Sequence, residues 1–92
     1  MSLLERSKYR TLEKLYFVCK HVRYEPSYRT WLQRAFGIQH RLWTKLIDEK
    51  ILIECGKVKN NNYGYSVGYT YNEESKFMEK IERKLGGMLK NV

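Results

Sequence analysis

The stretch that decides the fold runs from Pro26 to Glu54 and reads PSYRTWLQRAFGIQHRLWTKLIDEKILIE. Pro26 and Ser27 predict a helix start, because proline disfavours helix in the residue before it and serine caps free N–H groups. We therefore expect a short helix over residues 28–36. Three of its residues fall at inward-facing spacing: Trp31, Leu32 and Ala35.

The same stretch predicts a second helix directly after a tight turn. Gly37 ends the first helix, and Ile38 fills the turn with an apolar side chain. A helix over 39–50 then leads into a strand that begins at Ile51. Helix, glycine-containing turn, helix and strand is the pattern of a helix-turn-helix motif.

The second helix has two chemically different sides when its residues are placed about 100° apart on a wheel. The apolar side holds Leu42, Trp43, Leu46 and, at its edge, Ile47. The polar side holds His40, Arg41, Thr44, Lys45 and Asp48. Side chains of this polar kind hydrogen-bond to base edges and phosphates. The alternative is the ordinary solvated face of an amphipathic helix.

The charge of the chain points to a polyanionic partner. Lys and Arg number 18 against 10 Asp and Glu, a net charge of +8 on 92 residues, which favours nucleic acid. Residues 20–59 hold nine of these cations against four acids, so the excess falls on the helix-turn-helix stretch and the start of the next hairpin. A merely soluble basic surface is the alternative.

The length suits one domain, spanning residues 1–92, with a single modest core. No segment is long and apolar enough to cross a membrane, and MSLLERSKYR at the start lacks the features of a secretory signal. We therefore expect a cytoplasmic, intracellular protein that makes no contact with membranes.

The two cysteines are too few and too far apart for a disulfide framework. Cys19, His21, His40 and Cys55 lack the paired spacing of zinc ligands, so we expect no metal. Buried free thiols are the favoured state of Cys19 and Cys55, with a bridge within or between chains as the alternative.

The first helix is expected over residues 3 to about 22. Its apolar positions recur at three- and four-residue steps: Leu4, Leu12, Leu15, Tyr16, Cys19 and Val22. Phe17 and Val18 widen the apolar side, which leaves one face for a partner subunit. Residues 22–25 read as a short extended link.

Two strands over 51–59 and 65–71 predict a hairpin. The segment from Asn60 to Gly64 between them has turn chemistry, since Asn and Gly tolerate positive φ. Tyrosines alternate with small residues in the second strand, the period of a half-buried strand. We expect Tyr65, Tyr69 and Tyr71 to pack inward, with base stacking as the alternative.

The last helix is expected over about 73–90, with Asn72 as its N-cap. Its apolar stripe exceeds what a small three-helix core needs, so we expect dimerisation through this helix with help from the first. The expected dimer residues are Leu4, Phe77, Ile81, Leu85, Met88 and Leu89. A helix that folds back on its own domain is the alternative.

This order of elements resembles the winged helix-turn-helix plan, as in the MarR and PadR regulators and the small winged-helix proteins of archaeal viruses and plasmids. The local match is LWTKLIDEKILIE from Leu42 to Glu54, although Lys50 stands where most members have Gly. The resemblance implies an α+β fold with a three-helix core, a helix-turn-helix over about 27–50, a two-stranded β-wing over about 51–71 and an additional C-terminal helix.

The resemblance also implies which residues contact DNA. Its plan assigns the major groove to Gln39, His40, Arg41, Thr44 and Lys45, the wing contacts to Lys57, Lys59 and Asn61, and a phosphate contact to Arg29.

We expect a non-enzymatic, dimeric regulator of transcription that binds double-stranded DNA without a cofactor. The sequence holds no glycine-rich phosphate loop, paired carboxylates or nucleophile beside a base. The alternatives are a sequence-indifferent protein that coats DNA or acts in partition, and a winged helix that docks proteins.

Overall fold

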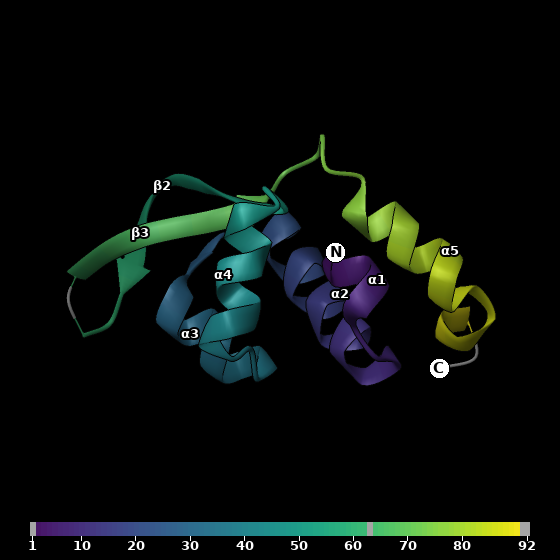
Figure 1. Cartoon of the computed structure of the whole chain (residues 1–92). Coiled ribbons are helices and arrows are strands. Elements are labelled where there is room, and N and C mark those ends of the chain that lie inside the picture. The colour runs from purple at the N-terminus through teal and green to yellow at the C-terminus, as the bar shows by residue number, and fades with distance from the viewer. Residues whose placement is uncertain (1, 63, 91–92) are drawn as a thin grey trace.

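The computed structural model describes residues 2–62 and 64–90, with side chains as far as Gly86. The chain is an α+β protein (Figure 1). Its sheet is three-stranded and antiparallel, with the strand order β1-β3-β2. The elements follow in this order: α1 (Leu3–Arg6), α2 (Tyr9–Tyr24), β1 (Ser27–Tyr28), α3 (Arg29–Phe36), α4 (His40–Asp48), β2 (Leu52–Asn60), β3 (Gly64–Tyr71) and α5 (Phe77–Lys90).

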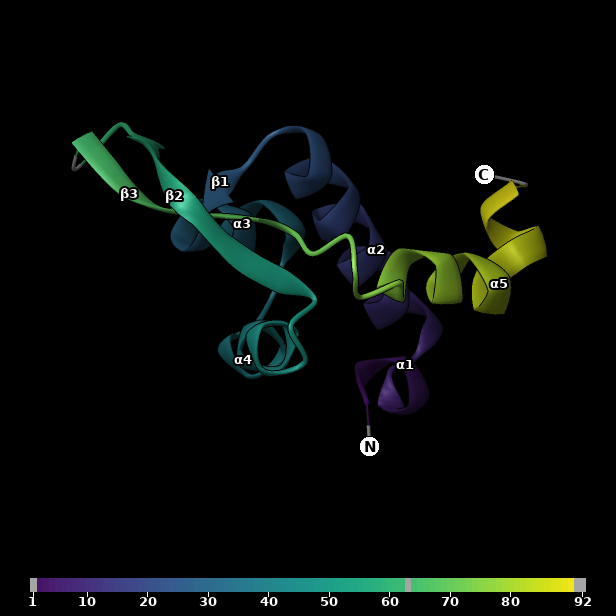
Figure 2. The ribbon, with the colours of Figure 1, turned by 90° about the horizontal axis from the view of Figure 1, so that it is seen from above.

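The helix α2 forms the centre of the molecule, between the α3–α4 pair and α5 (Figures 1 and 2). Its buried positions recur at three- and four-residue spacing: Leu12, Leu15, Val18, Cys19 and Val22. The prediction of one continuous helix over 3–22 was wrong in two respects: the helix is broken near its start, and it ends later than predicted. Ser7 and Lys8 are extended, which separates α1 from α2, and α2 continues through the expected link to Tyr24. The break lets Leu3 join the core, where it is 6% exposed.

The turn between α3 and α4 confirms the prediction at Gly37. This residue has φ 65° and ψ 40°, the left-handed conformation that glycine adopts without a steric cost. The N–H of Ile38 donates to the carbonyl of Gln33 at 2.9 Å, which closes the end of α3 in a Schellman pattern. Ile38 is 3% exposed and fills the turn from inside.

The start of α3 differs from the prediction. Ser27 belongs to β1, where it pairs with Tyr69 of β3, so Tyr28 rather than Ser27 occupies the N-cap position. Leu32 is fully buried, but Trp31 is 40% exposed. Ala35 is exposed as well. Leu32 is thus the fully buried residue of this eight-residue helix, and Phe36 packs against the core at its edge. The prediction that Trp31 and Ala35 also face inward was wrong.

The hairpin of β2 and β3 lies within about a residue of its predicted bounds, and it projects away from the helices (Figure 2). A β-bulge interrupts the register between Glu54 and Gly56, and Gly56 has φ 105°. Gly68 lies opposite the bulge, where a Cβ would lie 3.3 Å from Cys55 Sγ and only 2.5 Å from Cγ1 of the neighbouring Val58. Tyr63, in the predicted turn, lies outside the described residues.

The last helix begins later than predicted, at Phe77. Asn72 is not its N-cap: the Asn72 Oδ1 accepts from the N–H of Glu74 at 3.1 Å in a local turn. The hydroxyl of Ser75 accepts from the N–H of Phe77 at 3.2 Å, so Ser75 satisfies a donor at the helix start.

The dimer stripe expected on α5 lies in the chain's own core instead. Phe77 is 5% exposed, Ile81 0% and Leu85 5%, because α5 folds back beside α2 and α1. Leu4 packs against the same core. These residues have little surface left for a second subunit, so the alternative of a helix folded on its own domain describes the structure. The side chains of Met88 and Leu89 lie outside the described residues.

Candidate nucleic-acid interface

The exposed side of α4 carries residues that the winged-helix resemblance assigns to the major groove. His40, Arg41, Thr44 and Lys45 are all exposed. The opposite side anchors the helix through Trp43, 3% exposed, and Leu46, 0% exposed. The predicted division of the helix into two sides is confirmed, and the buried side of α4 packs into the core behind its polar face.

Contacts within α4 divide these polar residues into two groups. The hydroxyl of Thr44 donates to the carbonyl of His40 at 3.0 Å, and the same oxygen lies 3.5 Å from the Nε2 atom of His40. Within the described part of the chain, Arg41 and Lys45 have neither a hydrogen bond nor an ion pair through their side chains. Arg41 and Lys45 therefore keep their donors available for a ligand.

The β2–β3 hairpin presents cations on the side where α4 lies. The ring of Tyr69 meets the ring of Trp43 edge-on, with centroids 4.9 Å apart, so Tyr69 points toward α4. Strand alternation places Val67 and Tyr65 on the same face of β3 as Tyr69. The register pairs Lys57 with Val67 and Lys59 with Tyr65, so both lysines share that face.

The bulge at Cys55 decides this placement. Strict alternation from Leu52, which pairs with Tyr71, would put Lys57 and Lys59 on the opposite face of β2. The extra residue shifts the alternation by one position, since two residues oppose one across a bulge. As a result, Lys57 and Lys59 lie on the same face of the hairpin as Tyr69, nearer its tip.

The remaining predicted residues border this surface. Gln39 is the N-cap residue of α4 and makes no side-chain cap bond, and its side chain is exposed. Arg29 is the exposed first residue of α3. Asn61 is exposed in the turn, whereas Asn60 is 5% exposed and donates to the Ser66 hydroxyl at 2.7 Å. Asn60 therefore has a structural role in the turn.

A hollow of about 360 Å³ beside the hairpin includes residues that the sequence did not predict for the interface. Lys59 and Asn61 line it together with Trp31 and Tyr28. The sequence pattern predicts Trp31 as a core residue. The signal that could have placed it outside is its position next to Leu32, because adjacent helix residues point about 100° apart and a short helix buries only one of them.

The prediction of inward-facing tyrosines was correct for the base of β3 and wrong for its outer half. Tyr71 is 3% exposed and accepts the N–H of Met78 at its hydroxyl, and Tyr69 is half-buried. Tyr65 is 69% exposed and Val67 44%, because the hairpin extends past the helices there. Both are apolar groups available on the α4 side of the hairpin.

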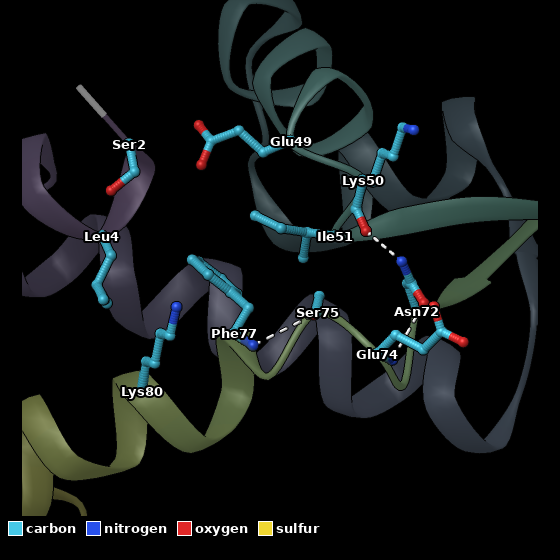
Figure 3. Close-up of a pocket in the computed structure, with 10 residues that line it drawn as sticks. All are labelled: Ser2, Leu4, Glu49, Lys50, Ile51, Asn72, Glu74, Ser75, Phe77 and Lys80. Carbon is cyan, nitrogen blue, oxygen red and sulfur yellow. Dashed lines mark hydrogen bonds between the residues drawn. The ribbon is translucent and has the colours of Figure 1, made fainter.

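A second hollow, of about 330 Å³, lies where the N-terminus, the end of α4 and the start of α5 meet (Figure 3). Glu49 accepts the N–H of Leu3 at 3.1 Å, and the amide of Asn72 donates to the carbonyl of Lys50 at 2.8 Å. The side chain of Lys50 points away from the hollow (Figure 3). These side chains bind backbone groups, so the hollow is a structural junction.

The cysteines differ in their surroundings. Cys19 is free and buried, and burial raises the pKa of its thiol. Cys55 is free and exposed at the bulge, so the prediction of two buried thiols was correct only for Cys19. Among the described residues, no three His, Cys, Asp or Glu side chains lie close enough together to hold a metal ion.

No helix in the described ranges is both long and apolar enough to span a membrane. Comparisons of the chain with protein-family models, with curated proteins and with solved structures find no match. A function for this chain therefore has to be inferred from its own residues and contacts.

Proposed function

We propose that this chain is a winged helix-turn-helix protein that binds double-stranded DNA and regulates transcription. The observation that carries the proposal is the arrangement of four exposed cations around one side of the sheet. Arg41 and Lys45 lie on α4, and Lys57 and Lys59 lie on the hairpin face that looks toward α4. In this proposal α4 is the recognition helix and the β2–β3 hairpin is the wing.

The order and pairing of the elements support this fold. The helix α2, strand β1, helices α3 and α4 and the hairpin follow one another as the winged-helix plan requires. The short strand β1 pairs with β3 and so closes a three-stranded sheet against the helices. The four-residue helix α1 and the terminal helix α5 are additions to that plan.

The chemistry of the exposed residues suits the two grooves differently. An α-helix fits the major groove, where a guanidinium such as that of Arg41 can bind the O6 and N7 atoms of guanine in a bidentate manner. Lys57 and Lys59 are suited to phosphates, which supply affinity without sequence information. Tyr65, at the same hairpin face, offers an apolar edge to the sugars of a minor groove.

The test is fluorescence anisotropy with the duplex upstream of the protein's own gene and a scrambled duplex of equal length, across a salt series. We expect a preference of about a thousandfold or more for the upstream duplex. Arg41→Ala should relax selectivity at one base position. The double substitution Lys57→Ala/Lys59→Ala should weaken both complexes and lower the salt slope by about 2, at roughly 0.9 per phosphate contact.

The matched control is the double substitution Lys80→Ala/Arg83→Ala, which removes two exposed cations from α5. It should leave the salt slope unchanged if the contacts are local. Equal binding of both duplexes would favour the protein that coats DNA. An absence of binding at low salt would overturn the proposal and favour a protein-docking module.

A further inference from the structure

One face of α2 is exposed although it carries two aromatic side chains. Phe17 is 41% exposed and Tyr24 79%. Arg10, Phe17 and Tyr24 follow one another at seven-residue intervals, so they form one row along the helix. Glu13 and Lys20, also seven residues apart, form a second row beside it. We call these five residues the α2 face.

The neighbouring sides of α2 are already occupied within the chain. On one side the hydroxyl of Tyr16 donates to Glu82 of α5 at 2.8 Å. On the other side His21 packs against Trp31 and Phe36 of α3, with ring centroids 5.0 and 5.5 Å apart. The α2 face lies between these two contacts. Four of its residues are exposed and Glu13 is half-buried, and the ring of Phe17 meets the ring of Tyr16 edge-on with centroids 5.9 Å apart. Both ribbon views place α2 between α3 and α5 (Figures 1 and 2).

We infer that a second copy of this chain covers the α2 face, with the two α2 helices antiparallel about a two-fold axis near Phe17. In such a pair, a residue that lies a given number of positions after Phe17 faces the residue that lies as far before it in the partner. Phe17 then meets its own counterpart at the axis.

The charges of the α2 face fit this arrangement. Lys20 lies three residues after Phe17 and Glu13 four before it, so the two differ by one residue, about 1.5 Å, along the helix axis. Each Lys20 would therefore pair with Glu13 of the other copy. Tyr24 and Arg10 lie seven residues to either side, which places the guanidinium over the phenol ring of the partner. Every charge of the face thereby gains a partner of suitable chemistry.

One nearby cation does not disturb this match. Lys14 would fall opposite Lys20, but its Nζ atom lies 3.5 Å from the carbonyl of Gly37, on the side of α3. The ammonium group is thus held away from the α2 face. The face also shares no residue with the proposed DNA interface, and a two-fold dimer that binds DNA would favour an inverted repeat.

The test is the mass of the protein in solution without DNA, by sedimentation equilibrium over a concentration series. We expect a reversible dimer of the 11.2 kDa chain. Lys20→Glu should weaken the dimer about tenfold or more, since it replaces two attractive pairs by two repulsive ones. Glu13→Lys/Lys20→Glu, which exchanges the two charges, should restore it.

The control is Arg83→Glu on α5, which changes the net charge as Lys20→Glu does and should leave the dimer intact. Phe17→Ala should also weaken the dimer, because it removes apolar contact at the axis without introducing like charges. Circular dichroism should show that each variant is folded. A wild-type monomer at all concentrations, or a Lys20→Glu dimer as tight as the wild type, would overturn the inference. The inference would also be overturned if Glu13→Lys/Lys20→Glu were a monomer. Because no DNA is present, these outcomes are independent of the proposed function.

Discussion

The ring of Trp43 meets the ring of Tyr69 edge-on, with centroids 4.9 Å apart and planes 90° apart. Trp43 belongs to the buried side of α4, and Tyr69 belongs to the central strand of the sheet, where it pairs with both Ser27 and Glu54. This contact therefore joins α4 to the strand that pairs with both of the others. It also identifies the face of the sheet that lies toward α4, which is the face that carries Lys57 and Lys59.

Replacing Tyr69 should test that role. Tyr69→Ala removes the ring and should lower the free energy of unfolding by about 1–3 kcal/mol, because the edge-to-face contact and part of the apolar burial are lost. DNA affinity should fall as well, although Tyr69 lies behind the proposed DNA interface. Tyr69→Phe keeps the ring and should retain both properties. Equal losses in the two variants, by urea unfolding and anisotropy, would assign the effect to the hydroxyl.

The central part of the fold could be predicted from sequence because its signals are local. Gly37 fixes the turn between α3 and α4, and the two-sided pattern around Trp43 and Leu46 sets the orientation of α4. The alternation in β3 and the Asn-rich turn define the hairpin. Each of these features depends on residues within one or two turns of the chain.

The features that could not be predicted from the sequence depend on contacts between residues that lie far apart in the chain. Nothing near Leu3 indicates that Glu49, 46 residues away, will accept its N–H at the start of α1. An apolar stripe on α5 fits a subunit interface and the chain's own core equally well, and only the packing of α5 on α2 decides between them. The bulge that places Lys57 and Lys59 also depends on pairing with β3.

Lys50 should be a site at which glycine stabilises the protein. Lys50 has φ 55°, and the N–H groups of Lys50 and Ile51 donate to Ile47 and Leu46 in the Schellman pattern that also closes α3. The left-handed conformation costs a non-glycine residue roughly 1–2 kcal/mol, and the greater flexibility of unfolded glycine offsets about 0.5–1 kcal/mol. Lys50→Gly should therefore raise the free energy of unfolding by about 0.5–1 kcal/mol.

The control for this prediction is Lys50→Ala, which removes the same charged side chain but keeps a Cβ in the left-handed conformation. It should give no gain in urea unfolding. A similar gain from alanine and glycine would show that the lysine side chain, and not the backbone, is unfavourable at this position.

The two cysteines should react with a thiol reagent at very different rates. Cys55 is exposed at the bulge, whereas Cys19 is 0% exposed and burial raises the pKa of its thiol, which disfavours the reactive thiolate. In the native protein at neutral pH, an aromatic disulfide reagent should modify one thiol rapidly. The second should react only in denaturant. Cys55→Ser should abolish the rapid phase, and a rapid phase that survives would show that Cys19 is accessible through local opening.

Ile81 distinguishes a core role of α5 from a subunit interface. Ile81 is 0% exposed within one chain, so Ile81→Ala should lower the free energy of unfolding by about 2–5 kcal/mol through lost burial and the cavity left behind. Arg83→Ala, two residues away on the exposed side of α5, should change it by less than about 0.5 kcal/mol. Under conditions in which Ile81→Ala is still folded, its association should equal that of the wild type. If Ile81→Ala kept the stability of the wild type but no longer formed a dimer, Ile81 would belong to a subunit interface. In that case α5 would not pack beside α2 of its own chain.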